Sequence, residues 1–409
     1  MKKEADSYSI ALIYLYYGSW SWYFDFFIKS CSHNTEITFI IISDIDPPEE
    51  YPKNIKFISR SLIEVEQLAT SKLGFKVSLS RAYKLCDFKP AYGYIFEDLL
   101  SDFQFWGHGD IDLVFGRIAS FIDAKVLSKY DTISVRHDYP SGFFMLYRNV
   151  PQVNKLFMKS RDYKFVFASD THYCFDECNF QHGFLFGGMN IFDTDSSIES
   201  MMHVIKKEEK EGAIRPYFDF CVCEGIPGNL KWDKGILSLN NEYEVLLYHF
   251  IQLKENDYFY KPSWIRIPDT FYIEKNGFFK YPKNSLIGFT SRFWVNSKVT
   301  SRKIWRNLLL KINKVIIGIH TLFSRQPNKY LGTYACRNKI LKIAKVKNKF
   351  YMSLSYPKIS MIKLDPVFYN PSLLVGYDIG LLLQKKQDEI IATRTDGQRE
   401  VFHRLGPSE

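Results

Sequence analysis

The first sixty residues alternate apolar runs with a helix-like segment, and this alternation limits the fold more than any other feature. Residues 7–17 (SYSIALIYLYY), 36–46 (EITFIIISDID) and 54–61 (NIKFISRS) are typical of strands, whereas residues 22–33 are typical of a helix. Strands that are apolar throughout and are joined through helices form largely parallel sheets. We therefore predict an α/β domain.

The same alternation continues along the chain. We predict two helices, over residues 61–74 and 80–100, then a central strand over residues 103–115, and a strand pair over residues 131–138 and 142–149. The first of these helices ends at Gly74, a natural C-cap. The second contains Pro90 and Gly93. Ligands of open α/β sheets bind at the carboxyl ends of the strands, so polar residues that follow the strands are the candidate site.

Composition sets the class of protein. The 409 residues are 46% hydrophobic and 17% aromatic, enough for a sizeable core and against wholesale disorder. Seven cysteines, an odd number in no obvious framework, indicate a reducing compartment. No run reaches the roughly 18 uninterrupted apolar residues of a membrane span. Glu4, Asp6 and Asp25 favour a buried strand and helix over a secretion signal at the N-terminus.

The net charge of +9 is unevenly distributed. Residues 1–274 carry 29 basic and 38 acidic side chains, residues 275–364 carry 20 basic and no acidic ones, and residues 365–409 carry 5 and 7. An acidic body with a strongly basic appendage indicates two parts with different roles. We place the boundary near residue 280, with a catalytic domain over residues 1–280 and a basic, mainly helical region over residues 281–409.

The basic region contains an amphipathic segment. Residues 302–325 place apolar side chains on one helical face and lysines and arginines on the other, and residues 335–350 form a second basic, helix-like segment. The first is typical of a helix that lies on an anionic membrane. The alternative is a helix that packs on the first domain with its charges in water. No nucleic-acid-binding signature is present.

Two carboxylates interrupt the apolar run FWGHGDIDLVFG, residues 105–116: Asp110 and Asp112. An unpaired buried charge costs several kcal/mol, so a cation is expected to meet them. Residues i and i+2 point to one side, which leaves Ile111 facing the core. Two converging carboxylates favour Mg²⁺ or Mn²⁺, whose open positions take substrate phosphates. The alternative is a turn with two solvated acids.

The block KLCDFKPAYGYIFEDLLSDFQFWGHGDIDLVFG (84–116) resembles a family of GT-A glycosyltransferases from bacterial polysaccharide clusters, catalogued mainly as a domain of unknown function. Four shorter stretches agree with this family in order, at residues 23–44, 142–149, 175–180 and 246–254. The resemblance covers residues 7–280. It implies the GT-A fold, a Rossmann-like mixed sheet, together with a nucleotide-sugar donor and metal dependence.

The resemblance also suggests donor and metal residues. Tyr16, Gly18 and Asp44, at the ends of the first two strands, would hold the nucleoside, and Asp87 and Lys89 would contact the donor. The alternatives are ordinary packing for the tyrosine and a surface salt bridge for Asp87 and Lys89. His249 would complete the metal site; otherwise it is a satisfied core histidine. His108, beside the acid pair, is the weaker ligand candidate.

Acidic residues further along are candidates for the acceptor side. Asp176 and Glu177 suit a carboxylate base for the acceptor hydroxyl, with Asp170 in reserve; the alternative is that all three are solvated loop acids. Both inversion and retention stay open. His172, Cys174, Cys178 and His182 surround these acids, but their spacing matches no strong structural zinc pattern.

Together these features predict a metal-dependent glycosyltransferase that uses Mn²⁺ or Mg²⁺ and a nucleotide-sugar, a UDP-sugar by preference. Its acceptor would be a saccharide or lipid-linked saccharide of a surface polysaccharide. We expect it in the cytoplasm, peripheral on the inner face of the membrane. A metal-dependent nucleotidyl or phosphoryl transferase would use the same acids but normally carries a glycine-rich phosphate loop. An inactive, transferase-like membrane scaffold is the alternative outside enzymes.

Overall fold

The computed structural model describes residues 8–300, apart from 220, 221, 252, 255, 257 and 258, and the strands between residues 331 and 404. The chain divides into two compact units, Met1–Asn296 and Ser297–Glu409. The predicted helix over residues 302–325 lies outside the described residues. Within the described residues, no helix is both long and apolar enough to cross a membrane.

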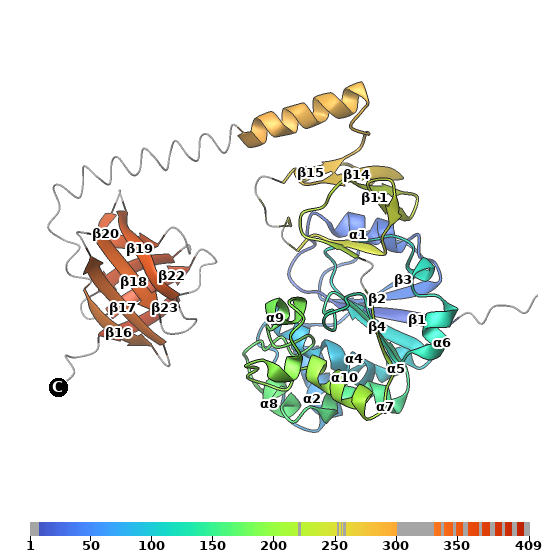
Figure 1. The fold of residues 1–409 in the computed structure, drawn as a ribbon, viewed down its shortest axis with the longest axis horizontal. Helices are drawn as coiled ribbons and strands as arrows, with labels where there is room; N and C mark the ends of the chain where they lie inside the picture. The colour runs from blue at the N-terminus through green and yellow to red at the C-terminus, as the bar shows by residue number, and fades with distance from the viewer. Residues whose placement is uncertain are drawn as a thin grey trace, which may run out of the picture. The chain divides into compact units, whose positions relative to one another are not determined.

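A mixed sheet of seven strands forms the centre of the first unit, within the part of the chain described (Figure 1). Its order is β3-β2-β1-β4-β7-β6-β8. The strands are β1 Ile10–Leu15, β2 Ile37–Ser43, β3 Ile55–Ser59, β4 Phe105–Gly109, β6 Thr132–Ser134, β7 Phe144–Arg148 and β8 Pro216–Phe218. Strands β1 to β4 are parallel, whereas β7 is antiparallel to both β4 and β6. The predicted α/β class is confirmed.

Helices cover both faces of this sheet. Among them are α1 Phe24–Cys31, α2 Leu62–Leu73, α6 Ala124–Lys129, α7 Pro151–Asn154, α8 Tyr163–Ala168, α9 His182–Phe186 and α10 Met201–Lys210. Leu12 and Tyr14 of β1 join a core with α1, whereas Ala11 and Ile13 join a second core with α2 and α10. This alternation is the two-residue period of a strand buried on both faces. A capping box on Ser61 begins α2, and Gly74 at φ +75° ends it as predicted.

The helix predicted over residues 80–100 is not continuous. It is a series of single turns, η1 Ala82–Lys84, α3 Leu85–Phe88, η2 Lys89–Ala91, α4 Tyr92–Ile95 and α5 Glu97–Leu100. Pro90 removes a backbone donor at the break. Gly93 is required by close packing, because a Cβ there would lie 2.2 Å from the ring of Trp106. The broken helix brings Lys89 to the sheet edge.

The central strand predicted over residues 103–115 is two strands in different sheets. After β4 the chain turns through Asp110, Ile111 and Asp112 into β5 Leu113–Phe115, which pairs with β13 Leu247–His249. Strand β13 pairs in parallel with β9 Val222–Glu224. The two acids therefore lie at the carboxyl end of β4, where the chain changes sheets.

A second small sheet extends the first unit. Its order is β12-β11-β10-β14-β15, with β10 Leu230–Asp233, β11 Ile236–Leu239, β12 Tyr243–Glu244, β14 Thr270–Glu274 and β15 Gly277–Phe279. Phe271 and Phe278 of this sheet contact Phe26 of α1, at ring-centroid distances of 5.2 and 4.3 Å. A helix over residues 286–300 follows, drawn in orange in Figure 1.

The second unit corrects the prediction of a mainly helical basic region. Its described residues from 332 onward are strands, β16 Gly332–Cys336, β17 Lys339–Val346, β18 Lys349–Leu354, β19 Ile359–Val367, β20 Asn370–Gly376, β21 Leu381–Lys386, β22 Glu389–Arg394 and β23 Arg399–Arg404. Neighbours are antiparallel, and β23 pairs with β16 to close the sheet. The helix-like segment 335–350 is in β16 to β18, because Leu341 and Ile343 alternate into a core at the period of a strand.

Candidate functional site

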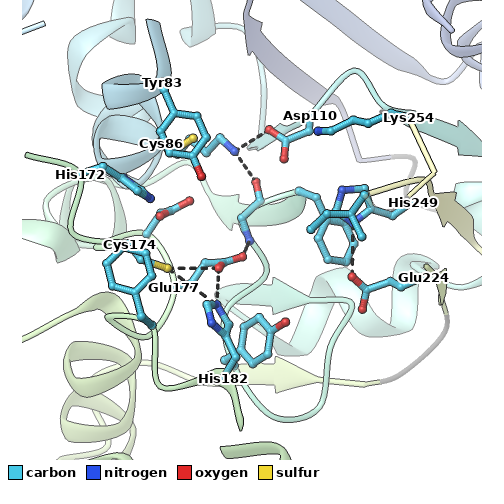
Figure 2. Close-up of a pocket in the computed structure, with 17 residues that line it drawn as sticks. Tyr83, Cys86, Asp110, His172, Cys174, Glu177, His182, Glu224, His249 and Lys254 are labelled. Atoms are coloured by element: carbon cyan, nitrogen blue, oxygen red, sulfur yellow. Dashed lines mark hydrogen bonds and ion pairs between the residues drawn. The ribbon is translucent and has the colours of Figure 1, made fainter. Parts of the chain in front are cut away.

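A pocket of about 400 Å³ lies at the carboxyl end of β4 (Figure 2). One side carries Asp110, His249 and Lys254, and the other carries Glu177 and His182. The pocket residues come from five parts of the chain: the broken helix from η1 onward, the turn between β4 and β5, the loop between β6 and β7, the segment from the end of α8 to the start of α9, and strands β9 and β13 with the residues that follow β13.

Each acid of the predicted pair meets a lysine. Lys89 Nζ lies 2.6 Å from Asp110 Oδ1 and also donates to the backbone oxygen of Gly142, at 2.8 Å. Lys254 Nζ lies 2.8 Å from Asp112 Oδ2. Burial by itself lowers the pKa of Lys89, but the adjacent charge of Asp110 outweighs it and raises that pKa well above its usual value. The positive charge expected beside these two acids is therefore provided by the ammonium groups of Lys89 and Lys254.

His249 lies within reach of the same acids. Its Nε2 is 3.5 Å from Asp112 Oδ2, and its Nδ1 is 3.3 Å from Glu224 Oε1. Burial lowers the pKa of His249, but these two carboxylates outweigh it and raise the pKa to about 9. Burial raises the pKa of Asp112, yet His249 and Lys254 together hold it below its usual range.

The structure brings the three predicted metal ligands together. One ligand atom from each of Asp110, Asp112 and His249 lies within 4.8 Å of the other two. Two carboxylate oxygens and an imidazole nitrogen suit Mn²⁺, and the carboxylates alone suit Mg²⁺. The donor set therefore fits a divalent cation. Binding requires that His249 loses its proton and that the cation displaces Lys89 and Lys254 from the two carboxylates.

Sequence reasoning missed Glu224 and Lys254. Glu224 stands opposite His249 in the parallel pairing of β9 and β13 and also forms an ion pair with Arg136. No local pattern gives this pairing. Lys254 lies in the stretch LLYHFIQLK, five residues after His249, so a search for charged residues beside the histidine would have found it.

Asp176 and Glu177, the predicted acceptor acids, occupy different environments. Glu177 accepts from the Gly142 N–H at 2.7 Å and from the Cys174 thiol at 3.3 Å, and His182 Nε2 lies 2.7 Å from its Oε2. Burial raises the pKa of Glu177, but these partners outweigh it and lower the value. Asp176 is buried, and no hydrogen bond or ion pair within the described residues reaches its carboxylate. Burial and then the charge of Glu177 raise its pKa well above the usual value.

Gly142 joins the two sides of the pocket. Its carbonyl accepts from Lys89 and its N–H donates to Glu177. A Cβ at this position would lie 2.7 Å from Asp176 Oδ2 and 2.8 Å from Glu177 Oε1, so a larger residue would force these two carboxylates to shift. The backbone here fixes the acceptor acids relative to the lysine that holds Asp110.

Asp87, predicted to contact the donor, is placed elsewhere. Its side chain is fully buried and is not part of the pocket wall, so it is not a surface salt bridge either. Lys84 Nζ lies 2.7 Å away, His172 Nδ1 lies 3.1 Å away, and the N–H groups of Tyr173 and Phe175 donate to it. Asp87 thus holds the loop that leads to Asp176. Asp170 accepts a bond from Ser78 and also lies outside the pocket wall.

Tyr16, Gly18 and Asp44 gather at the carboxyl ends of β1 and β2, the sheet edge that also carries Asp110. The Tyr16 N–H donates to Ile42 O, and its ring stacks on Trp20 at 5.5 Å. Gly18 has φ +114° and open space around its Cα, and Asp44 is exposed. None of the three lines the pocket itself.

The remaining histidines and cysteines also have clear positions. His108 is fully buried near the rings of Tyr92 and Tyr147, and burial holds its pKa well below the usual value. Cys174, Glu177 and His182 form a second group whose ligand atoms lie within 4.8 Å of one another. Cys178 is buried outside that group.

Comparisons with known proteins place most of the chain in one family. A family model described as a family of unknown function, DUF6625, matches residues 12–282. No curated protein has a significantly similar sequence. Among solved structures, a match is the galactosyltransferase LgtC in complex with donor and acceptor sugar analogs, at 11% identity and a TM-score of 0.24. That match covers 39% of this chain and 66%, just under two thirds, of the galactosyltransferase.

Proposed function

Because the chain belongs to DUF6625, a family of unknown function, we propose its activity from the pocket: metal-dependent glycosyl transfer from a nucleotide-sugar. The proposed donor is a UDP-sugar, and the acceptor is a saccharide or lipid-linked saccharide. The observation that carries the proposal is the convergence of Asp110, Asp112 and His249 within 4.8 Å, on the edge of a pocket that also holds Asp176 and Glu177.

Asp110, Asp112 and His249 would hold Mn²⁺ or Mg²⁺. When bound, such an ion neutralises a diphosphate and stabilises the charge that develops on a leaving nucleoside diphosphate. Lys254 is the residue that can also meet this charge, because its side chain is about one third exposed in the pocket. Lys89 is buried, and its ammonium group donates to both Asp110 and the backbone oxygen of Gly142, so its role is to hold Asp110 in place.

The acceptor side would work through Asp176. Proton transfer needs a carboxylate whose oxygens can reach the acceptor hydroxyl, and Asp176 lines the pocket with no hydrogen-bond or ion-pair partner on its oxygens within the described residues. Glu177 is already engaged by Gly142, Cys174 and His182, so it fixes the loop rather than taking the acceptor proton.

The nucleoside would bind along the same sheet edge. Tyr16 and Trp20 offer a stacked aromatic surface there, and the exposed carboxylate of Asp44 suits ribose hydroxyls. The proposal keeps surface polysaccharide synthesis as the setting, with the enzyme at the inner face of the membrane. It rests on the resemblance of residues 84–116 and not on the match to a solved structure.

The alternative of an inactive scaffold has one observation in its favour, since both acids already have lysine partners. Calorimetric titration of UDP into the full chain, with and without Mn²⁺, separates the two. We expect binding only with Mn²⁺, and its loss in Asp112→Asn but not in the control Asp98→Asn, whose side chain is 80% exposed. Binding that needs neither Mn²⁺ nor Asp112, or no binding at all, would contradict metal-dependent transfer.

A further inference from the structure

The helix over residues 286–300 packs on the small sheet through one side. Gly288, Arg292 and Val295 are buried there. Arg292 Nη2 lies 2.6 Å from Glu274 Oε1 at the end of β14, and its guanidinium stacks on Phe279 of β15 at 4.3 Å. This side of the helix is therefore fixed to the first unit by a buried ion pair and a ring contact.

The opposite side is apolar and exposed. Leu286, Ile287, Phe289 and Phe293, which we call the apolar face, are each 57–80% exposed. Leu286, Phe289 and Phe293 are spaced i, i+3 and i+7, so they form one stripe along the helix. Single exposed apolar residues are common on proteins, but three large ones in one stripe, with a fourth, Ile287, exposed beside its N-terminal end, mark an interaction surface.

The charged residues that flank the apolar face in the sequence indicate the kind of surface it contacts. Between Lys275 and Leu364 the chain has 20 lysines and arginines and no acid. Lys280 and Lys283, at the start of the helix, are exposed. The nearest acid before this stretch, Glu274, is already bound to Arg292. An apolar face within a purely basic stretch complements an anionic surface with an apolar interior, which is a bilayer of anionic lipids.

The same charges disfavour protein partners from this chain. A second copy that docked on the apolar face would bring two acid-free basic stretches together. The second unit begins within the basic stretch, since β17 alone carries three lysines, but its residues 365–409 carry 5 basic and 7 acidic side chains. Like charges in close contact are destabilising, so a second copy that contacts this face through its own basic stretch is not the favoured occupant.

We propose that the apolar face inserts into the headgroup region of an anionic membrane and attaches the first unit to it. The apolar side chains would lie at the acyl boundary, and the neighbouring lysines would contact lipid phosphates. The helix would lie on the membrane and not cross it. This attachment does not depend on the proposed transferase activity, because it stands on the helix alone.

The test is flotation of the full chain with vesicles of phosphatidylcholine and phosphatidylglycerol, compared with phosphatidylcholine alone. We expect binding to the anionic vesicles only, weakened by salt. The double change Phe289→Ser and Phe293→Ser should lower the partition coefficient by at least about tenfold. The matched control is Phe165→Ser, an equally exposed phenylalanine on α8.

Three results would overturn the attachment. One is equal binding of the double variant and the wild type to anionic vesicles. Another is no binding by the wild type together with a lower melting temperature of the double variant, which would show that the chain covers this face itself. A third is concentration-dependent dimerisation, lost in the double variant, without vesicle binding. Unchanged circular dichroism of the double variant establishes that it is folded, and UDP titration of the same samples reports the proposed activity separately.

Discussion

Lys254 Nζ lies 2.8 Å from Asp112 Oδ2, although 142 positions separate the two residues. Lys89 stands in the same relation to Asp110, at 2.6 Å. Each acid is thus paired with an ammonium group of the chain, Asp112 in a buried position and Asp110 with its side chain 39% exposed. A divalent cation that binds Asp110, Asp112 and His249 has to compete with these lysines and with the proton on His249.

This competition predicts the effect of Lys254→Met. Removing a positive charge near the cation lowers electrostatic repulsion by about 1–4 kcal/mol at short range, so Mn²⁺ affinity should rise about tenfold. UDP affinity in the presence of Mn²⁺ should fall, because Lys254 no longer meets the diphosphate. Calorimetry measures both. Lys231→Met, which breaks an ion pair with Asp233 on β10, should change neither. Weaker Mn²⁺ binding in Lys254→Met would contradict the competition.

The raised pKa of His249 predicts a pH dependence of stability in metal-free protein. The groups that face this ring are Asp112, Glu224 and the Phe143 ring, with the charge of Asp110 nearby. A folded-state pKa of about 9, above the unfolded value near 6.5, stabilises the fold fully below pH 6.5. That stabilisation is lost as the pH rises through 9, and it is worth up to about 3 kcal/mol.

Urea denaturation in EDTA at several pH values measures this loss. The free energy of unfolding of wild type should fall between pH 6.5 and 9 relative to that of His249→Gln, whose side chain does not titrate. Parallel curves for the two proteins would show that the histidine is not protonated beside Asp112.

Part of this site could be predicted from the sequence, and the rest depends on long-range pairing. Asp110 and Asp112 were placed at a strand end from the local pattern, and His249 from the resemblance. Glu224 reaches His249 only because β9 and β13 pair in parallel, which no local signal gives. In the second unit, the run KILKIAKV spaces its apolar residues compatibly with both a helix and a strand, and pairing with β16 and β18 settles it as β17. Asp87 differs from the solvated acids because its side chain is fully buried, and the local sequence CDFKP does not predict that burial.

Asp87 is therefore predicted to affect stability and not donor binding. Asp87→Asn leaves the buried ammonium of Lys84 without its counter-charge, which costs about 3 kcal/mol. Thermal unfolding should show a melting temperature several degrees lower, with Mn²⁺ and UDP affinities unchanged in the folded protein. Asp44→Asn is the matched variant, since that residue is exposed at the end of β2. It should weaken UDP binding without lowering the melting temperature. Weaker UDP binding in Asp87→Asn, with an unchanged melting temperature, would instead support contact of Asp87 with the donor.

Gly142→Ala tests the link between the two sides of the pocket. The new methyl group would meet Asp176 Oδ2 at 2.7 Å and Glu177 Oε1 at 2.8 Å, so both carboxylates have to shift from their present positions. The Glu177 bond to the Gly142 N–H would lengthen, and Asp176 would lose its position facing the acceptor. Because Asp110, Asp112 and His249 lie on the other side, Mn²⁺-dependent UDP binding should change less than threefold, a difference under about 1 kcal/mol. Sugar transfer or UDP-sugar hydrolysis should fall at least about a hundredfold, the range expected for loss of a general base.

The exposed Gly183, where a Cβ meets nothing within 4 Å, provides the control Gly183→Ala. Equal losses of binding and turnover in Gly142→Ala would instead mean that the glycine supports the whole pocket, and unchanged turnover would exclude Asp176 as the residue that takes the acceptor proton.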